Sequence, residues 1–568
     1  MNLPTRGPRR SGSVSFDAVS RRKFLALGGV GAVALALASC GRTTVPGAQM
    51  VGPPSGVPAA PPGPGDVVHG RSGGSVVTAW TAEGNSYDAQ LGYDLHSWEA
   101  VTSLLYLPLF RFEGQAGGAA PAAAAALPEI SEDGTRYVIR LRPDVKFHNG
   151  RPVVADDYVY AWRRLLDPAT ESWASGYFSS IVGSEDYLAG ISTALPGVYA
   201  QDDLTLIVEL SAPDVTFTSL MAQPYAAALP REEVERLGEE FSRTPVGNGP
   251  FMITSYDTKN RRSVFVRSPY YPWPGLPFLD EVVYRWGIDP SMQFLQLQNG
   301  DVDILGEGLT PTIAERVQGN PELRETYTKF IPVLGAGWAA LNVATDKLAD
   351  PRVRQALNWA TDKDQLAKYS RGLQKSWGAI IPEDEPDYQR IVPPYSYDLT
   401  RAKALMKDAG VDSLELEFFC NDDDYWKSAS LVLQQQWAEI NVDLNITTLS
   451  NAAFWTALDN GEADVFGRQF YQVQPTGLDI LASNFVTGAS SNFQGYSNPR
   501  VDDLAGRSLA SLTREESNAH LARAEALVAE DAPGVFIGSL QFYAMRSPRV
   551  QNYQMRAETG TYYDRIWV

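Results

Sequence analysis

Residues 128–167 contain the clearest alternation of apolar and polar positions in the chain. A turn signal at 132–134, Glu-Asp-Gly, is followed by apolar side chains at every second position, which is the period of a half-buried strand. After a second turn signal, Asn149-Gly150, apolar side chains recur at helical spacing from about Asp156 onward. The positions concerned are Tyr137, Ile139 and Leu141, and then Val159, Trp162, Leu165 and Leu166. The pattern predicts a strand, a turn and an amphipathic helix.

Strand-like and helix-like stretches alternate along the rest of the chain. Single strands are predicted at 74–80, 279–286 and 533–543, and two strands around an Asp-Asp turn at 198–210. A helix is predicted after Asp350, with Pro351 at its first position. The strand–helix–strand order over 414–449 predicts a parallel sheet with a crossover helix. The Gly/Ala-rich stretch 114–126 is predicted to be a surface loop.

The segment DGTRYVIRLRPDVKFHNGRPVVADDYVYAWRR resembles the N-terminal signature of the family 5 extracellular solute-binding proteins, which are receptors of ABC importers. Three further stretches resemble recurrent family features: TPVGNGPFMITSY at 244–256, the block 338–365, and YDLTRAKALMKDAG at 397–410. Asn248 in the first of these stands where many members carry threonine. The matches to the family are spread over most of the chain.

The resemblance implies an α/β fold of the two-lobed periplasmic-binding-protein type (type II, cluster C), with an extra subdomain inserted in the first lobe. More than one lobe is also expected from length, because about 500 residues exceed a single hydrophobic core. The implied limits are 71–107, 229–332 and 533–568 for the first lobe, 108–228 for the extra subdomain, and 333–532 for the second lobe.

The N-terminus carries export signals. Ser20-Arg21-Arg22-Lys23-Phe24-Leu25 matches a twin-arginine motif, and the apolar run that follows is too short to span a bilayer. Leu37-Ala38-Ser39-Cys40 matches the lipobox of bacterial lipoproteins. We therefore expect a signal peptide over 1–39, a lipidated Cys40, and a Pro/Gly-rich tether up to residue 70. The expected location is extracytoplasmic, at the cell membrane through the lipid alone.

Charge and cysteine content restrict the partners. The net charge of −19 disfavours nucleic acid, since neutralising phosphates requires basic patches. With Cys40 lipidated, only Cys420 remains, so no intramolecular disulfide is expected. The four histidines are isolated and lack metal-ligand spacing, and no nucleophile–base constellation is recognisable. We expect a monomer without metal or cofactor that is not an enzyme; a secreted hydrolase is the least favoured alternative.

Ligand contacts are expected between the two lobes, where aromatic side chains at strand ends suit the walls of peptide pockets. The residues favoured by pattern and resemblance are Trp80, Trp98, Trp338, Tyr425, Trp426, Arg468, Gln469, Phe470, Tyr471 and Asp479. In peptide-binding members, an acid in the segment "GW..D...P" pairs with the α-ammonium of the ligand. The equivalent stretch here, DVFGRQFYQVQPTGLD, has no acid between Asp464 and Asp479.

The missing acid leaves two interpretations open. In the first, Asp479 or one of Asp422, Asp423 and Asp424 pairs with the α-ammonium of the ligand, and the ligand is an oligopeptide delivered to an ABC permease. Alternatively, Arg468 lies in the cleft and favours an anionic group, and the ligand is a non-peptide solute such as an opine, an oligosaccharide or a metal chelate.

Overall fold

The computed structural model describes residues 70–113, 118–307, 311–370, 374–385, 387–421, 424–555 and 560–568. The twin-arginine segment, Cys40, the tether, Asp422 and Asp423 lie outside these residues. Among the helices within them, none combines the length and the apolar character that a bilayer crossing requires.

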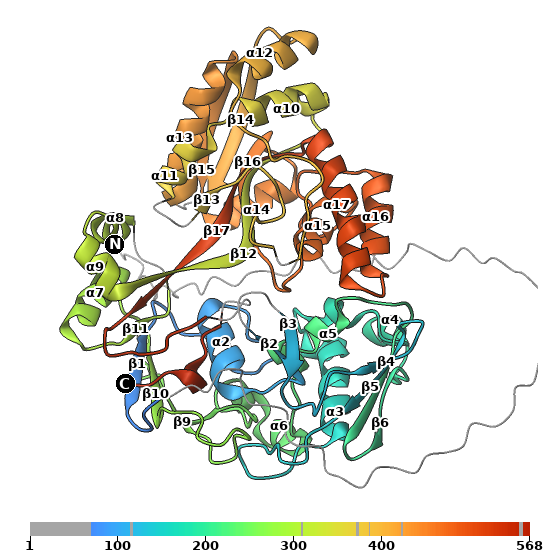
Figure 1. The fold of residues 1–568 in the computed structure, drawn as a ribbon, viewed down its shortest axis with the longest axis vertical. Coiled ribbons are helices and arrows are strands. Elements are labelled where there is room, and N and C mark those ends of the chain that lie inside the picture. The colour runs from blue at the N-terminus through green and yellow to red at the C-terminus, as the bar shows by residue number, and fades with distance from the viewer. Residues whose placement is uncertain are drawn as a thin grey trace, which may run out of the picture.

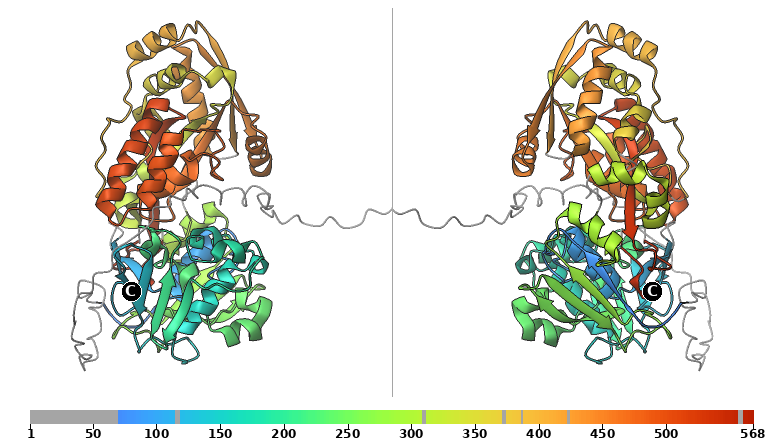
Figure 2. Two further views of the ribbon diagram at one scale, coloured as in Figure 1. Left: turned by 90° about the vertical axis from the view of Figure 1, so that its right-hand side faces the viewer. Right: turned by 90° about the vertical axis from the view of Figure 1, so that its left-hand side faces the viewer.

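The chain forms two lobes stacked along its long axis (Figures 1 and 2). The lower lobe is coloured blue to green and also contains the dark-red C-terminal end, and the upper lobe is coloured yellow to red. Their hydrophobic cores are separate. The cores of the lower lobe are built from residues between Val76 and Val317 and from residues near the C-terminus, Ala544 to Ile566. The cores of the upper lobe are built from residues between Ala336 and Ile537. The two-lobed α/β architecture implied by the resemblance is thus confirmed.

One eleven-stranded sheet continues through both lobes, in the order β15-β14-β16-β12-β17-β11-β1-β10-β9-β8, with β13 also paired to β17. Its lower-lobe strands are β1 (Ser75–Ala79), β8 (Phe251–Asp257), β9 (Arg262–Arg267), β10 (Glu281–Arg285) and β11 (Ile304–Leu305). Its upper-lobe strands are β13 (Gln374–Ser376), β14 (Leu414–Asn421), β15 (Val442–Leu449) and β16 (Val465–Tyr471). The predicted parallel pair over 414–449 is confirmed as β14 and β15.

The long antiparallel strands β12 (Thr328–Leu341) and β17 (Gly534–Arg546) pass from one lobe to the other (Figure 1). Their register shifts between Pro332 and Ala336, which is where the pair leaves the lower lobe. The limits implied by the resemblance put the chain's passage into the second lobe at residue 333 and its return to the first lobe at residue 533. In the structure the first residues of β17, 535–537, pack in the upper cores, and the strand reaches the lower core only at Ala544.

The predicted signature segment contributes two strands, and the predicted pair at 198–210 the other two, to a second, four-stranded sheet, β4-β5-β7-β6, in the lower lobe. Its strands are β4 (Glu129–Ile130), β5 (Arg136–Arg140), β6 (Val198–Asp202) and β7 (Thr205–Glu209), and the helix that follows the signature is α3 (Ala155–Leu166). Tyr137 and Ile139 are buried on β5, and Trp162 is buried on α3, as the periodicity predicts. The other lower-lobe helices are α2 (Leu95–Ala100), α4 (Ser184–Leu188), α5 (Phe217–Leu220), α6 (Arg231–Leu237), α7 (Pro290–Asn299), α8 (Pro311–Gln318) and α9 (Pro321–Tyr327).

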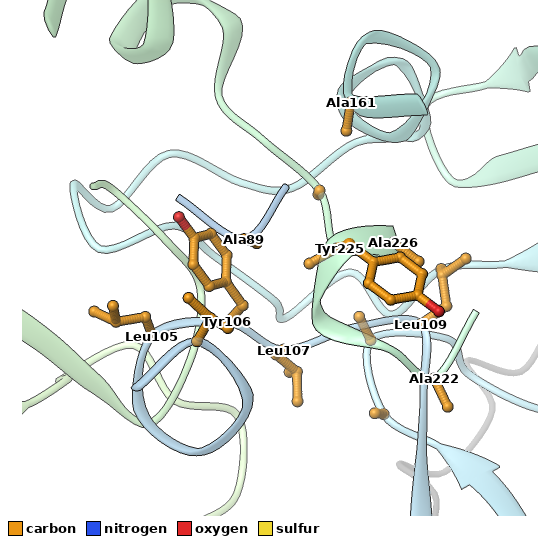
Figure 3. Close-up of a cluster of buried hydrophobic side chains, with 14 of the residues drawn as sticks. Ala89, Leu105, Tyr106, Leu107, Leu109, Ala161, Ala222, Tyr225 and Ala226 are labelled. Carbon is orange, nitrogen blue, oxygen red and sulfur yellow. The ribbon is translucent and has the colours of Figure 1, made fainter. Parts of the chain in front are cut away.

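The Gly/Ala-rich stretch was expected to be a surface loop, and this is wrong for its second half. Residues 118–121 form β3 (Gly118–Pro121), paired with β2 (Phe110–Glu113), and the alanines at 122–124 are fully buried. Small side chains here allow close packing beneath the segment 105–109. Figure 3 shows Leu105, Tyr106, Leu107 and Leu109 of that segment, with Tyr225 and Ala226 near Leu109.

The upper-lobe helices are α10 (Pro351–Trp359), α11 (Lys363–Tyr369), α12 (Leu399–Asp408), α13 (Asp424–Ala438), α14 (Asn451–Asp459), α15 (Gly477–Phe485), α16 (Pro499–Leu509) and α17 (Arg514–Asp531). These helices contribute to two separate cores. One contains residues of α10, α12 and α13, and the other contains residues of α14 to α17. The central strands β12 and β16 contribute to both cores, so both of their faces are buried in large part.

Candidate functional site

The loop 472–476 lies at the lower edge of the upper lobe. It follows β16, which is antiparallel to β12, and Tyr471 at the end of β16 pairs with Gly335. The amide of Gln472 donates to the carbonyl of Leu334 at 2.9 Å. Because Leu334 lies where β12 crosses between the lobes, the loop is held beside the crossing strands.

The lower lobe touches this loop directly. Gln223 is fully buried, and its Nε2 donates to the carbonyl oxygen of Val473 at 2.7 Å. A second contact between the lobes joins the amide of Val215 to the carbonyl of Leu509 at 2.9 Å. Both lower-lobe residues belong to the segment 108–228 that the resemblance identifies as an extra subdomain, so this part of the lower lobe carries contacts that hold the lobes together.

Four aromatic side chains of the lower lobe cluster near Gln223. The ring centroids of Trp98 and Trp173 are 5.9 Å apart, those of Trp173 and Tyr225 are 5.6 Å apart, and Tyr177 stacks on Tyr225 at 6.0 Å. Tyr225 is fully buried, whereas the other three are half-buried. Burial, reinforced by the charge of Asp479, raises the pKa of Tyr177 and keeps its hydroxyl protonated. The cluster therefore lies opposite the loop of the upper lobe.

We call this arrangement the interlobe site: the four aromatic residues, Gln223, the loop 472–476 and Asp479. Asp479 is at the start of α15, and its Oδ2 accepts from the amides of Val473 at 2.6 Å and Gln474 at 3.2 Å. Burial raises the pKa of this carboxyl to about 6. A carboxylate that accepts two backbone amides fixes the shape of the loop rather than presenting a free charge.

Glu385 supports the same loop from the other side. Its Oε1 accepts from the amide of Gly477 at 2.8 Å and lies 3.8 Å from Nη2 of Arg514. Nη2 of Arg514 in turn donates to the carbonyl of Pro475 at 2.7 Å. Burial raises the pKa of Glu385 to about 7. Two buried carboxyl groups and one arginine thus determine the backbone geometry of the loop.

The structure brings several of the residues expected at the site together. Trp98 and Asp479 belong to the interlobe site, and Gln469, Phe470 and Tyr471 lie on the part of β16 that leads into the loop. Tyr471 is exposed, and Gln469 and Phe470 are half-buried. Four residues of this group, Gln469 to Tyr471 and Asp479, belong to the predicted stretch DVFGRQFYQVQPTGLD.

The other expected contacts are buried inside a lobe. Trp80 stacks on His96 with centroids 4.9 Å apart, and Trp338 lies against Phe485 at 5.8 Å. Tyr425 and Trp426 begin α13 and belong to an upper core, while Arg468 is buried beside Asn484. Aromatic residues at a strand end could be recognised from the sequence, but their burial depends on which helices cover the sheet.

Sequence reasoning missed Trp173, Tyr177, Gln223 and Tyr225. They lie in irregular segments or short 3₁₀ turns, such as Ser175–Phe178 and Pro224–Ala226, where no period marks the buried side. Their only sequence signal is the density of aromatic residues in WASGYF and QPY. Within the described residues, no group of three His, Cys, Asp or Glu side chains is arranged to hold a metal ion.

Residues 118–492 match the family model described as bacterial extracellular solute-binding proteins, family 5 middle. Heme-binding protein A of Haemophilus influenzae is 26% identical over 80% of this chain and 85% of its own length. The dipeptide-binding protein of Escherichia coli is 25% identical over 75% of this chain and 82% of its own. The crystal structure of Haemophilus influenzae OppA covers 88% of this chain and 100% of its own, with a TM-score of 0.70 and 23% identity.

Proposed function

Because the chain belongs to the bacterial extracellular solute-binding proteins of family 5, we propose that it captures oligopeptides between its two lobes and delivers them to the permease of an ABC importer. The family consists of binding proteins, and the chain is not an enzyme. The single observation that carries the proposal is the interlobe site, where half-buried aromatic rings of one lobe face a backbone loop of the other. Closing two lobes on a solute is a hinge motion without covalent chemistry.

The chemistry of the site suits a peptide backbone. A peptide receptor satisfies the ligand's amides with backbone groups and accepts varied side chains in roomy, hydrated pockets. The backbone amides of the loop 472–476 already have acceptors. Among the described residues, β14 pairs with β16 only at Val465 and Phe466, so the backbone edge of Gln469, Phe470 and Tyr471 that faces away from β12 is the one proposed to meet the ligand. We propose that Trp98 and Tyr471 contact the ligand and that Asp479 acts on it through the loop that it holds. OppA of Haemophilus influenzae, which shares the fold, was crystallised in complex with RPPGFSPFR.

A non-peptide solute is the second candidate. One relative is named a heme-binding protein and another a probable deoxycholate-binding periplasmic protein, and both names point to largely apolar ligands. The aromatic cluster around Tyr225 would suit such a ligand equally well.

The test is native mass spectrometry of mature protein purified without added ligand. We expect wild-type protein to carry a ladder of adducts with peptide masses, and Tyr471→Ala to lose most of them, since truncating a central aromatic contact costs about 2 kcal/mol or more, a loss of affinity of about 30-fold. Tyr369→Ala is the matched control, because Tyr369 is 46% exposed against 47% for Tyr471 but lies on α11. A single adduct of non-peptide mass would favour the second candidate, and equal loss in both variants would remove Tyr471 from the site.

We further propose that the protein is a monomeric lipoprotein held outside the cytoplasm by Cys40. In cells, wild-type protein is expected in the membrane fraction and Cys40→Ser in the soluble extracytoplasmic fraction, because the cysteine thiol is the acylated group. Cys420→Ser is the control: this thiol is buried in β14, so the variant should stay in the membrane fraction. Retention of Cys40→Ser on the membrane would contradict the proposed anchor.

A further inference from the structure

Arg468 is a buried cation in the interior of the upper lobe. It lies on β16 directly opposite Trp338 of β12, so both side chains project from the same face of the sheet. Its guanidinium carbon lies 5.3 Å from the ring centroids of Trp455 and Phe493 and 5.9 Å from that of Trp338. Three aromatic rings therefore surround a positive charge.

This guanidinium has few acceptors. Its Nη2 donates to Oδ1 of Asn484 at 3.2 Å, while Nε is buried without an acceptor in the part of the chain that the structure describes. No carboxylate within those residues forms an ion pair with it. Burial alone lowers the pKa of Arg468 to about 10, with no nearby anion to offset it.

A second donor in the same place is also unsatisfied. The indole Nε1 of Trp338 is buried and has no acceptor among the described residues. Because Trp338 and Arg468 are cross-strand neighbours, the two donors belong to one small region. An unpaired buried donor and an unpaired buried charge are both costly, and both costs are relieved by the same kind of partner, an anion that accepts hydrogen bonds.

Another arginine of this lobe shows how the fold satisfies a buried guanidinium. Arg354 is exposed to the same extent as Arg468, 6% in each case. Its guanidinium donates to the carbonyl oxygens of Asp531, Leu348 and Ala349. Aromatic faces attract a cation, but they offer no acceptor in the plane of the guanidinium. Arg468 thus differs from Arg354 in lacking acceptors, and not in its degree of burial.

We propose that Arg468 and Trp338 Nε1 bind a small monovalent anion of the size of chloride inside the upper lobe. The site is separate from the interlobe site, since Phe470 and Tyr471 lie between Arg468 and the loop on β16. A halide is favoured because Arg468 is only 6% exposed and the centroids of three aromatic rings lie within 5.9 Å of its guanidinium carbon, so the smallest common anion fits the surroundings best.

The test compares the melting temperature of full-length mature protein in sodium chloride, sodium bromide and sodium gluconate. All three are used at an ionic strength of about 0.1 M, so that general screening is the same. An anion that binds only the folded state raises Tm, and we expect a rise of about 2–4 °C in chloride or bromide over gluconate. Arg468→Met is expected to abolish this halide difference, and Trp338→Phe, which keeps a ring but removes the donor, to reduce it.

Arg354→Met is the matched control: it should lower Tm in every salt and keep the halide difference. Should Arg468→Met fail to fold, crystals grown in bromide provide an independent measurement, with an anomalous peak expected at hydrogen-bonding distance from Nε of Arg468. The proposal is overturned if wild-type protein melts at the same temperature in all three salts, if Arg468→Met keeps the halide difference, or if bromide occupies no position beside Arg468.

Discussion

Replacing Asn248 with alanine is expected to destabilise the lower lobe by about 2–6 kcal/mol, because two buried backbone groups each lose a partner at about 1–3 kcal/mol. Oδ1 of Asn248 accepts from the amide of Leu107 at 2.8 Å, and its Nδ2 donates to the carbonyl of the same residue at 2.9 Å. The side chain is buried and replaces the pairing that a neighbouring strand would give. Alanine would leave both groups of Leu107 unpaired.

The glycines on either side explain why this side chain can approach so closely. A Cβ atom on Gly247 would lie 2.0 Å from the carbonyl oxygen of Leu105, and one on Gly249 would lie 2.5 Å from that of Leu104. The segment therefore packs directly on the backbone of 104–107. Threonine has a single hydroxyl on a shorter side chain in place of the separate oxygen and nitrogen of the amide, so we expect it to replace the two bonds only in part.

The measurement is urea unfolding followed by tryptophan fluorescence. Asn248→Thr should lie between wild type and Asn248→Ala. Asn299→Ala is the control, since Asn299 is exposed at the end of α7 and such substitutions usually change stability by less than about 0.5 kcal/mol. If Asn248→Ala lowers the free energy of unfolding no more than Asn299→Ala does, water replaces the two hydrogen bonds of the side chain and the prediction is wrong.

Local patterns predicted the elements well wherever one face of an element is buried. The strand of Tyr137 and Ile139, and the helix of Trp162, have a polar side and an apolar side, so the period appears in the sequence. The Gly/Ala stretch before them gave no period, because small residues are selected for close packing and not for amphipathicity. Its buried alanines at 122–124 were for that reason interpreted as a loop.

The candidate site was harder to predict for a related reason. Both faces of β16 are covered, so alternation cannot say whether Arg468 points to solvent, to a ligand or into a core. The contact of Gln223 with Val473 joins residues 250 positions apart, and it depends on how the two lobes meet around β12 and β17. The family resemblance pointed to the stretch 464–479, whose role in ligand binding stays a prediction, but it did not point to the lower-lobe residues near the loop 472–476.

Replacing Glu385 with glutamine is expected to remove much of the pH dependence of stability between pH 4.5 and 7. Burial raises the pKa of this carboxyl from 4.5 to about 7 in the folded protein. Within that window the folded state keeps a proton that the unfolded chain has released, so stability falls as pH rises. The loss amounts to about 3 kcal/mol, since each unit of pKa difference corresponds to about 1.4 kcal/mol. Above pH 7 the full loss is present, and below pH 4.5 there is none.

Glutamine at 385 keeps an oxygen for the amide of Gly477 and carries no charge to bury, so the variant should match wild type near pH 4.5 and exceed it by up to about 3 kcal/mol at pH 8. The measurement is the free energy of unfolding in urea at pH 4.5, 6, 7 and 8.

Asp479→Asn is the matched comparison, because Asp479 holds the same loop. The pKa of the Asp479 carboxyl is raised from 3.8 to about 6, so the difference in stability between this variant and wild type should develop at lower pH and be complete by about pH 6–7. A difference between Glu385→Gln and wild type that stays constant from pH 4.5 to 8 would mean that Glu385 is already ionised at acid pH, held so by Arg514, and that the loop 472–476 rests on a true ion pair.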